Sequence, residues 1–170
     1  MSGKHNIISV FEYHQGVKLP DFFKQIEKFD FELRCKYTHL LLKECLILDA
    51  LADCIAYECL NPDNIVIYEE SQKVMINYII RPNHIDGKNF KGKQVATLLE
   101  CIFVKNRYVP DKLWDFLADL RRNENINIVG IFSKWKEIEG VLIDEHKKLK
   151  KETFAAYLIR RFKQIFRKRR

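Results

Sequence analysis

The chain has 170 residues, 47% apolar and 31% charged, with only six glycines and four prolines, which predicts one folded domain, or one domain with an appended helix, and excludes a disordered or fibrous chain. Its formal net charge of +7 is divided unevenly, because residues 147–170 carry eleven Lys or Arg against one acid (+10), while residues 1–146 carry nineteen basic and twenty-two acidic groups (−3). A mildly acidic body with a strongly basic end excludes a domain that wraps nucleic acid over its whole surface, and indicates a body tethered by one end to something anionic.

The first part of the chain predicts a strand followed by two helices. Residues 8–17 are predicted as the strand. Apolar side chains at helical spacing then predict a short helix at residues 19–29. The longest periodic run extends from Leu33 to Ile55 at intervals of three and four. It predicts one continuous, largely buried helix at about residues 32–56.

A β-hairpin is predicted next. Two runs of alternating apolar residues, Asn64–Tyr68 and Lys73–Ile80, are separated by four polar residues, and this pattern is typical of paired antiparallel strands. Because an isolated two-stranded hairpin is only marginally stable in water, we expect it to pack on helices.

The second half of the chain is predicted to be helical. Helices are expected at residues 93–105 and from Pro110 through Arg122, the second opened by its proline. Residues 126–132, with the sequence INIVGIF, fit either a short buried strand or the start of a helix. Ser133 is predicted to cap the helix that follows, and a last helix is predicted at about residues 151–167.

Residues 57–64, YECLNPDN, resemble the catalytic loop of protein kinases, H-R-D-L-x-P-x-N. Leu60, Pro62 and Asn64 match that pattern, whereas Cys59 stands where the family places the aspartate that accepts the substrate proton. Asn77 follows Asn64 by thirteen positions, where the family has its metal-binding Asp. An asparagine brings no negative charge to a magnesium site. The resemblance therefore implies a degenerate nucleotide and metal site formed by Cys59, Asn64 and Asn77.

The resemblance extends upstream of this loop. Residues 8–17 are similar to the last strand of a kinase small lobe leading into the hinge, and the helix at 32–56 is similar to the helix before the catalytic loop. If so, the chain starts at the hinge, and no G-x-G-x-x-G run is present. An alternative stays open, because an N-P-D-N turn between a helix and a hairpin is also common turn chemistry without any kinase ancestry.

Other chemistry-bearing residues receive plain structural interpretations. The five histidines and five cysteines follow no metal-ligand spacing, so no metal and no cofactor are expected. The cysteines are interpreted as reduced core residues, which favours a cytosolic location. Residues 1–13 do not resemble a signal peptide. The pairs Asp49/Asp53 and Asp115/Asp119 are interpreted as solvated helix faces.

The C-terminal segment is predicted to be a basic amphipathic helix. Its apolar side chains, Phe154, Tyr157, Leu158, Phe162, Ile165 and Phe166, recur every three or four residues. This pattern suits a helix lying on an anionic membrane leaflet. The residues predicted to bind that surface are Arg160, Arg161, Lys163, Arg167, Lys168, Arg169 and Arg170. Two alternatives remain, namely packing of the stripe on the body and binding of phosphate backbones of nucleic acid.

Taken together, these features predict an α+β, mostly helical fold. Residues 1–146 would form a body like the large lobe of a kinase, with one hairpin, and residues 147–170 the basic amphipathic segment. This order resembles the cytosolic portion of the EssB/YukC family, the pseudokinase-like membrane subunit of type VII secretion systems. The resemblance implies a non-catalytic scaffold in the cytoplasm, at the inner face of the membrane, that docks to unidentified protein partners. A small active phosphotransferase of the sugar or lipopolysaccharide kinase type and a nucleic-acid-binding protein are the alternatives.

Overall fold

The computed structural model describes residues 13–25, 30–79, 90–123, 125–153 and 155–159. It is mostly helical with one small antiparallel sheet, which confirms the predicted α+β, mostly helical class. In chain order the elements are β1 (Val17–Lys18), α1 (Leu19–Gln25), α2 (Phe31–Glu44), the 3₁₀ helix η1 (Cys45–Ala50), α3 (Asp53–Cys59), the 3₁₀ helix η2 (Pro62–Asn64), β2 (Ile65–Tyr68), β3 (Lys73–Ile76), α4 (Phe90–Ile102), α5 (Asp111–Arg122) and α6 (Ile128–Lys151).

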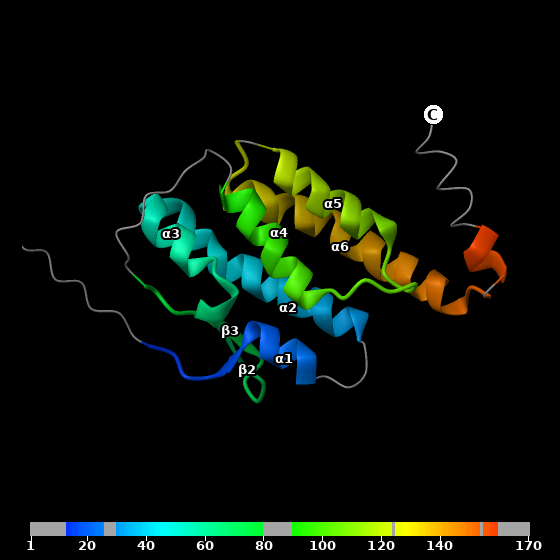
Figure 1. Cartoon of the computed structure of the whole chain (residues 1–170), viewed down its shortest axis with the longest axis horizontal. Coiled ribbons are helices and arrows are strands. Elements are labelled where there is room, and N and C mark those ends of the chain that lie inside the picture. Colours follow the sequence, from blue (N-terminus) through cyan, green and yellow to red (C-terminus); the bar gives the residue numbers. More distant parts are fainter. Residues whose placement is uncertain (1–12, 26–29, 80–89, 124, 154, 160–170) are drawn as a thin grey trace, which may run out of the picture.

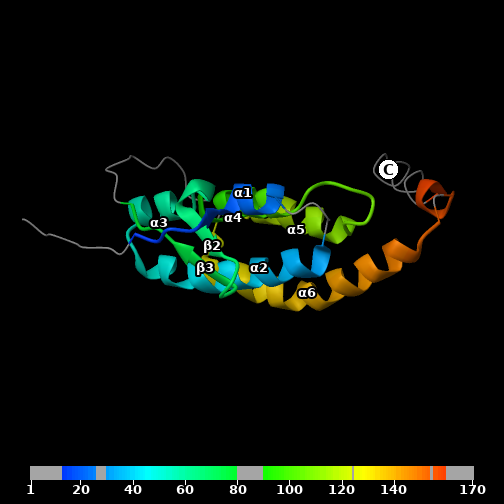
Figure 2. The same ribbon diagram turned by 90° about the horizontal axis from the view of Figure 1, so that it is seen from below.

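The larger helices form two layers with the core between them (Figures 1 and 2). In one layer α2 and α6 lie side by side, and in the other α4 lies beside α5, with α1 next to α4. Each layer buries large apolar side chains against the other: Phe31 from α2, Leu99 from α4, Leu117 from α5 and Trp135 from α6 are fully buried. Burying one such side chain contributes about 1.5–3 kcal/mol, so this interface stabilises the fold.

The sheet has three strands, one more than the predicted hairpin. The hairpin itself is confirmed, with Ile65 opposite Ile76 and Tyr68 opposite Lys73. The third strand, β1, pairs antiparallel with β2 on its other side. Of the strand predicted at residues 8–17, only Val17 lies in β1, residues 13–16 are not in a strand, and residues 8–12 lie outside the described residues. Gly16 permits this approach, because a Cβ at that position would lie 3.0 Å from the carbonyl oxygen of Ile67. The sheet packs against α1 and α2, as expected for so small a sheet.

The single helix predicted at residues 32–56 is wrong, because the segment forms α2, η1 and α3. The chain is extended at Leu51 (φ −94°, ψ 158°) and Ala52 (φ −58°, ψ 141°). A tertiary anchor lies just before this break: the Asp49 carboxylate accepts hydrogen bonds from the Val129 N–H and from Lys91 Nζ, each at 3.0 Å. The Asp49 side chain is only 18% exposed, so its interpretation as part of a solvated face was also wrong.

The helices α4, α5 and α6 correspond to three of the predicted helices, with differences at their ends. Helix α4 begins at Phe90 and ends at Ile102, three positions before the predicted bounds, whereas α5 matches. The ambiguous segment 126–132 leads into α6, which begins at Ile128. Ser133 lies inside α6, and the cap is Asn127, whose Oδ1 accepts the Gly130 N–H at 2.8 Å. Helix α6 runs through Lys151, so the last helix does not begin there.

Candidate functional site

The three residues of the predicted degenerate site converge around the base of the hairpin. Asn64 ends η2, Asn77 directly follows β3, and Cys59 ends α3. The Asn77 N–H donates to the Asn64 carbonyl oxygen at 2.7 Å. The Asn64 side chain in turn donates through Nδ2 to the carbonyl oxygen of Glu58 at 2.8 Å. The amide of Asn64 therefore holds the end of α3 against the turn.

The side chain of Asn77 is bound on both sides by the backbone of His14. Its Oδ1 accepts the His14 N–H at 2.7 Å, and its Nδ2 donates to the His14 carbonyl oxygen at 3.1 Å. The two bonds resemble the pair that two opposed residues of antiparallel strands exchange, and here the Asn77 side chain makes both of them and so fixes the His14 backbone beside the end of β3. The residue is 3% exposed. Both polar atoms of the amide are thus engaged within the fold.

Cys59 offers no proton acceptor at neutral pH. It is fully buried. Burial raises the pKa of its thiol to about 11, although the Ile79 N–H lowers the pKa in part; the charge of Glu58 raises it further. Because the pKa lies far above neutrality, the sulfur carries its proton and is neither a nucleophile nor a base.

The carboxylate nearest to Asn64 in sequence does not turn toward these residues. Asp63 is 68% exposed at its side chain and pairs with Lys18 at 3.5 Å. Among the residues that the structure describes, no group of three or more His, Cys, Asp or Glu side chains could hold a metal ion. The hydrogen bonds of Asn64 and Asn77 therefore have a structural role: they hold the segment around His14, the N-P-D-N turn and the hairpin together.

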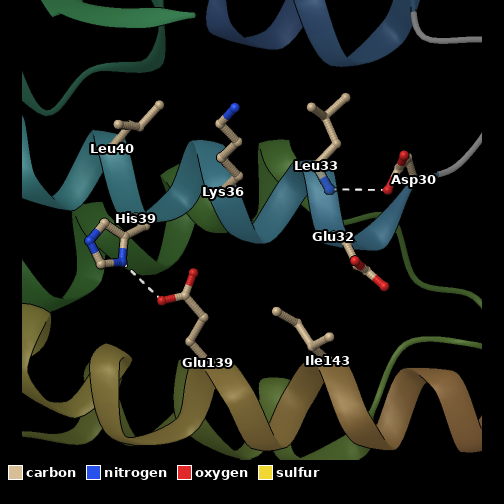
Figure 3. Close-up of a pocket in the computed structure, with 8 residues that line it drawn as sticks. All are labelled: Asp30, Glu32, Leu33, Lys36, His39, Leu40, Glu139 and Ile143. Carbon is tan, nitrogen blue, oxygen red and sulfur yellow. Dashed lines mark hydrogen bonds and ion pairs between the residues drawn. The ribbon is translucent and has the colours of Figure 1, made fainter.

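A second feature is a groove of about 470 Å³ between α2 and α6, shown in Figure 3. Leu33, Leu40 and Ile143 form its apolar lining. The polar lining residues are Asp30, Glu32, Lys36, His39 and Glu139. His39 Nδ1 lies 2.9 Å from Glu139 Oε2. No lining residue is a serine, threonine or cysteine, so the His–Glu pair has no nucleophile to activate.

Sequence reasoning did not predict this groove. His39 and Glu139 are 100 positions apart, and the groove exists only because α2 and α6 pack side by side. Neither histidine spacing nor charge pattern along one segment signals such a pair. Helical periodicity places Leu33 and Leu40 on the apolar face of α2. The sequence therefore indicates that these two lining residues share a helix face, but it does not indicate the groove.

The predicted surface-binding residues Arg160, Arg161, Lys163, Arg167, Lys168, Arg169 and Arg170 lie outside the described residues. The segment just before them is described. Residues 155–159 are helical, and Figure 1 places them beyond the end of α6. Leu158 is 40% exposed and Ile159 is 57% exposed. Both side chains are therefore exposed at the surface of the described part of the chain, whereas Tyr157 of the same segment is half-buried.

No family model, no curated protein and no solved structure matches the chain. Within the described residues, no helix is both long enough and apolar enough to cross a bilayer.

Proposed function

We propose that this chain is a non-catalytic docking protein, with a body like the large lobe of a kinase, which attaches to an anionic membrane surface through its basic C-terminal segment. The observation that carries the proposal is the separation of charge, +10 in residues 147–170 against −3 in the rest. Long-range attraction of this kind concentrates one end of a molecule at an oppositely charged surface.

The engagement of the kinase-like residues supports the absence of catalysis. A phosphoryl transfer site needs a proton acceptor or water-positioning group and carboxylates that hold magnesium beside the phosphates. Here Cys59 is a buried thiol, and the amide of Asn77 is bound to the backbone of His14. The order of helix, N-P-D-N turn and antiparallel hairpin supports the proposed likeness to a kinase large lobe.

The exposure of Leu158, a member of the apolar stripe, and of Ile159 beside it supports membrane attachment of this segment, whereas Tyr157 of the stripe is half-buried. An interfacial helix needs apolar side chains that are free to enter the boundary between headgroups and acyl chains. Residues 154–170 hold seven basic side chains. Each contributes about 1 kcal/mol near an anionic surface, and together they exceed the cost of ordering one short helix.

Vesicle flotation of the full chain and of a truncation after Thr153 tests the attachment. The truncation is placed there because α6 is continuous through Lys151 and should remain intact. The full chain is expected to float with vesicles of phosphatidylglycerol and phosphatidylcholine and to stay behind with phosphatidylcholine alone. Equal flotation of the two forms, or flotation of the full chain with neutral vesicles, would remove the proposal.

A thermal-shift titration tests the absence of catalysis separately. The phosphotransferase alternative predicts that ATP with Mg²⁺ raises the melting temperature, because a ligand that binds the folded state stabilises it. We expect no change up to millimolar ATP. A saturable increase that requires both ATP and Mg²⁺ would contradict the non-catalytic assignment and leave the membrane proposal standing.

A further inference from the structure

The connection between α4 and α5, residues 103–110, meets the C-terminal end of α6 at one end of the molecule (Figures 1 and 2). Two contacts join them. His146 of α6 is 1% exposed, and its Nδ1 lies 2.7 Å from the carbonyl oxygen of Tyr108. Tyr157, beyond the end of α6, lines one pocket together with Lys105 and Arg107. We call this end of the molecule, made of residues 103–110, 147–151 and 155–159, the basic end.

The basic end carries exposed positive charge from two distant parts of the sequence. Its exposed basic residues are Lys105, Arg107, Lys147, Lys148, Lys150 and Lys151. Lys147 pairs with Glu32 at 3.4 Å. None of the other five forms an ion pair with any residue in the described part of the chain. Arg107 donates a hydrogen bond to the hydroxyl of Tyr108 and its guanidinium carbon lies 4.5 Å from the centroid of that ring, but neither contact neutralises its charge. The charge of these five residues is therefore available to an anionic surface.

Exposed apolar side chains accompany these charges. Val104 is 58% exposed and directly precedes Lys105, while Leu158 and Ile159 lie in the helical turn beyond α6. A surface with basic side chains next to exposed apolar ones fits the interface of an anionic bilayer, where headgroup phosphates and acyl chains lie side by side. A nucleic acid backbone offers the phosphates without the acyl chains.

Between the two segments lies a pocket of about 170 Å³, lined by Lys105, Asn106, Arg107, Val109, Asp111, Trp114 and Tyr157. Lys and Arg are the usual partners of phosphate oxygens. Asp111 opposes an anion there, so the pocket itself holds two basic residues against one carboxylate. Trp114 and Tyr157 are aromatic residues of the kind that gather at headgroup level.

We propose that Lys105 and Arg107 form a second contact with the anionic membrane, beside the basic segment, and that a phospholipid headgroup phosphate binds in the pocket between them. This inference rests on the proposed membrane attachment and adds a site to it from residues forty or more positions before that segment. The loop and the segment then dock on one bilayer surface, and the pocket fixes the orientation of the body on the membrane.

The test is the partition of the full chain onto phosphatidylglycerol vesicles, with the double variant Lys105→Ala/Arg107→Ala. Because each basic side chain contributes about 1 kcal/mol at an anionic surface, the variant is expected to bind about tenfold to thirtyfold more weakly. The matched control is Lys93→Ala/Arg122→Ala, which removes two exposed basic residues from the start of α4 and the end of α5. It is expected to bind within about twofold of the parent. Equal melting temperatures establish that both variants fold.

The possible outcomes distinguish failure of the second contact from failure of the proposed membrane attachment. If the full chain binds anionic and neutral vesicles equally, the membrane proposal fails and this inference fails with it. If the full chain prefers anionic vesicles, the truncation after Thr153 loses binding, and Lys105→Ala/Arg107→Ala binds like the parent, then the second contact alone is overturned. An equal loss in both double variants also overturns it, because the effect would then reflect net charge.

Tryptophan fluorescence reports on the pocket directly. Trp135 is fully buried in the core, whereas Trp114 is half-buried and lines the pocket. We expect the emission to shift to shorter wavelength with phosphatidylglycerol vesicles, and to stay unchanged with phosphatidylcholine vesicles or in Trp114→Phe. The same shift with inorganic phosphate or with RNA of equal phosphate concentration would contradict a membrane headgroup as the occupant.

Discussion

The side-chain amide of Asn77 makes two hydrogen bonds of which a carboxylate could make only one. One side of the amide accepts the His14 N–H and the other donates to the His14 carbonyl oxygen. A carboxylate has no N–H to donate, so an aspartate here would set an oxygen against the carbonyl oxygen of His14. The residue that the kinase comparison assigns to metal binding is instead a connector between the N-terminal segment and the hairpin.

Replacing Asn77 with aspartate is therefore expected to destabilise the protein. Asn77→Asp should lower the free energy of unfolding by about 1–3 kcal/mol, the cost of an unsatisfied buried polar group. Urea unfolding followed by circular dichroism measures the change. Millimolar Mg²⁺ should not restore the loss, and restoration by Mg²⁺ would reveal a metal site that this account excludes.

Asn61→Asp is the matched control for that variant. Asn61 is exposed, and its side chain only accepts a hydrogen bond, from the Asp63 N–H at 3.1 Å. Asparagine and aspartate are about equally good acceptors at such a cap, so the change should be within about 0.5 kcal/mol. A comparable loss at both positions would mean that the His14 contacts do not account for the effect.

The hairpin pattern of the sequence sets Asn64 opposite Asn77, and the Asn77 N–H donates to the Asn64 carbonyl oxygen at 2.7 Å. The pattern could not predict the engagement of Asn77, because His14 lies 63 positions earlier and nothing local to either residue indicates the other. Asp49 was misread for the same reason, since its partners Lys91 and Val129 are 42 and 80 positions away.

Asp49 makes the stability depend on pH in a definite direction. Burial disfavours the charged form, but the Val129 N–H and Lys91 outweigh it, so the pKa of Asp49 lies below its ordinary value of 3.8. A lowered folded-state pKa contributes stability above the unfolded pKa, and that contribution is lost as the pH falls through the folded value. Asp49→Asn should cost about 1–3 kcal/mol at neutral pH.

Urea unfolding at several pH values measures the contribution of the Asp49 carboxylate to stability. The difference in unfolding free energy between the parent and Asp49→Asn should be constant down to about pH 4 and should narrow below it. Asp53→Asn is the control, because Asp53 is 71% exposed and lies 3.9 Å from Lys91. A difference that widens in acid would refute the assigned role of Asp49.

At the scale of elements, the sequence predicted those helices and strands that depend on the residues within them. The hairpin follows from its alternating residues and polar turn, and α5 follows from its proline start and periodicity. The break after η1 and the pairing of β1 with β2 depend instead on tertiary contacts between residues that are distant in the sequence. The strand predicted at residues 8–17 shares only Val17 with β1, because a strand of two residues has almost no periodicity to fix its bounds, and the pairing of β1 with β2 was not predicted.

The start of α6 gives a prediction at this scale. Asn127 caps the helix through the Gly130 N–H, whereas Ser133, the cap expected from the sequence, lies within α6 and is exposed. Asn127→Ala should lower the free energy of unfolding by about 1 kcal/mol. Ser133→Ala should change it by less than about 0.5 kcal/mol, since an exposed helical alanine is favourable. Thermal and urea unfolding of the two variants distinguish them, and a greater loss in Ser133→Ala would reverse the assignment.

At the scale of the whole molecule, exposed basic residues from two distant parts of the sequence meet at the basic end: Lys105, Arg107, Lys147, Lys148, Lys150 and Lys151. The sequence alone indicated the C-terminal segment, because eleven basic residues in twenty-four positions are visible as a run. It did not indicate Lys105 and Arg107, which join that end only through the contact of His146 with Tyr108 and the pocket shared with Tyr157. When basic residues from distant parts of the chain are brought together by packing, no run of basic residues in the sequence indicates it.

We propose that the basic end binds a membrane and not the phosphate backbone of a nucleic acid. The most direct measurement is flotation of the full chain with phosphatidylglycerol vesicles while RNA is added at equal phosphate concentration. If apolar side chains enter the bilayer as proposed, the protein should continue to float with the vesicles, because RNA matches only the electrostatic part of the binding. Transfer of the protein from the vesicles to the RNA, or no flotation even before RNA is added, would contradict the account.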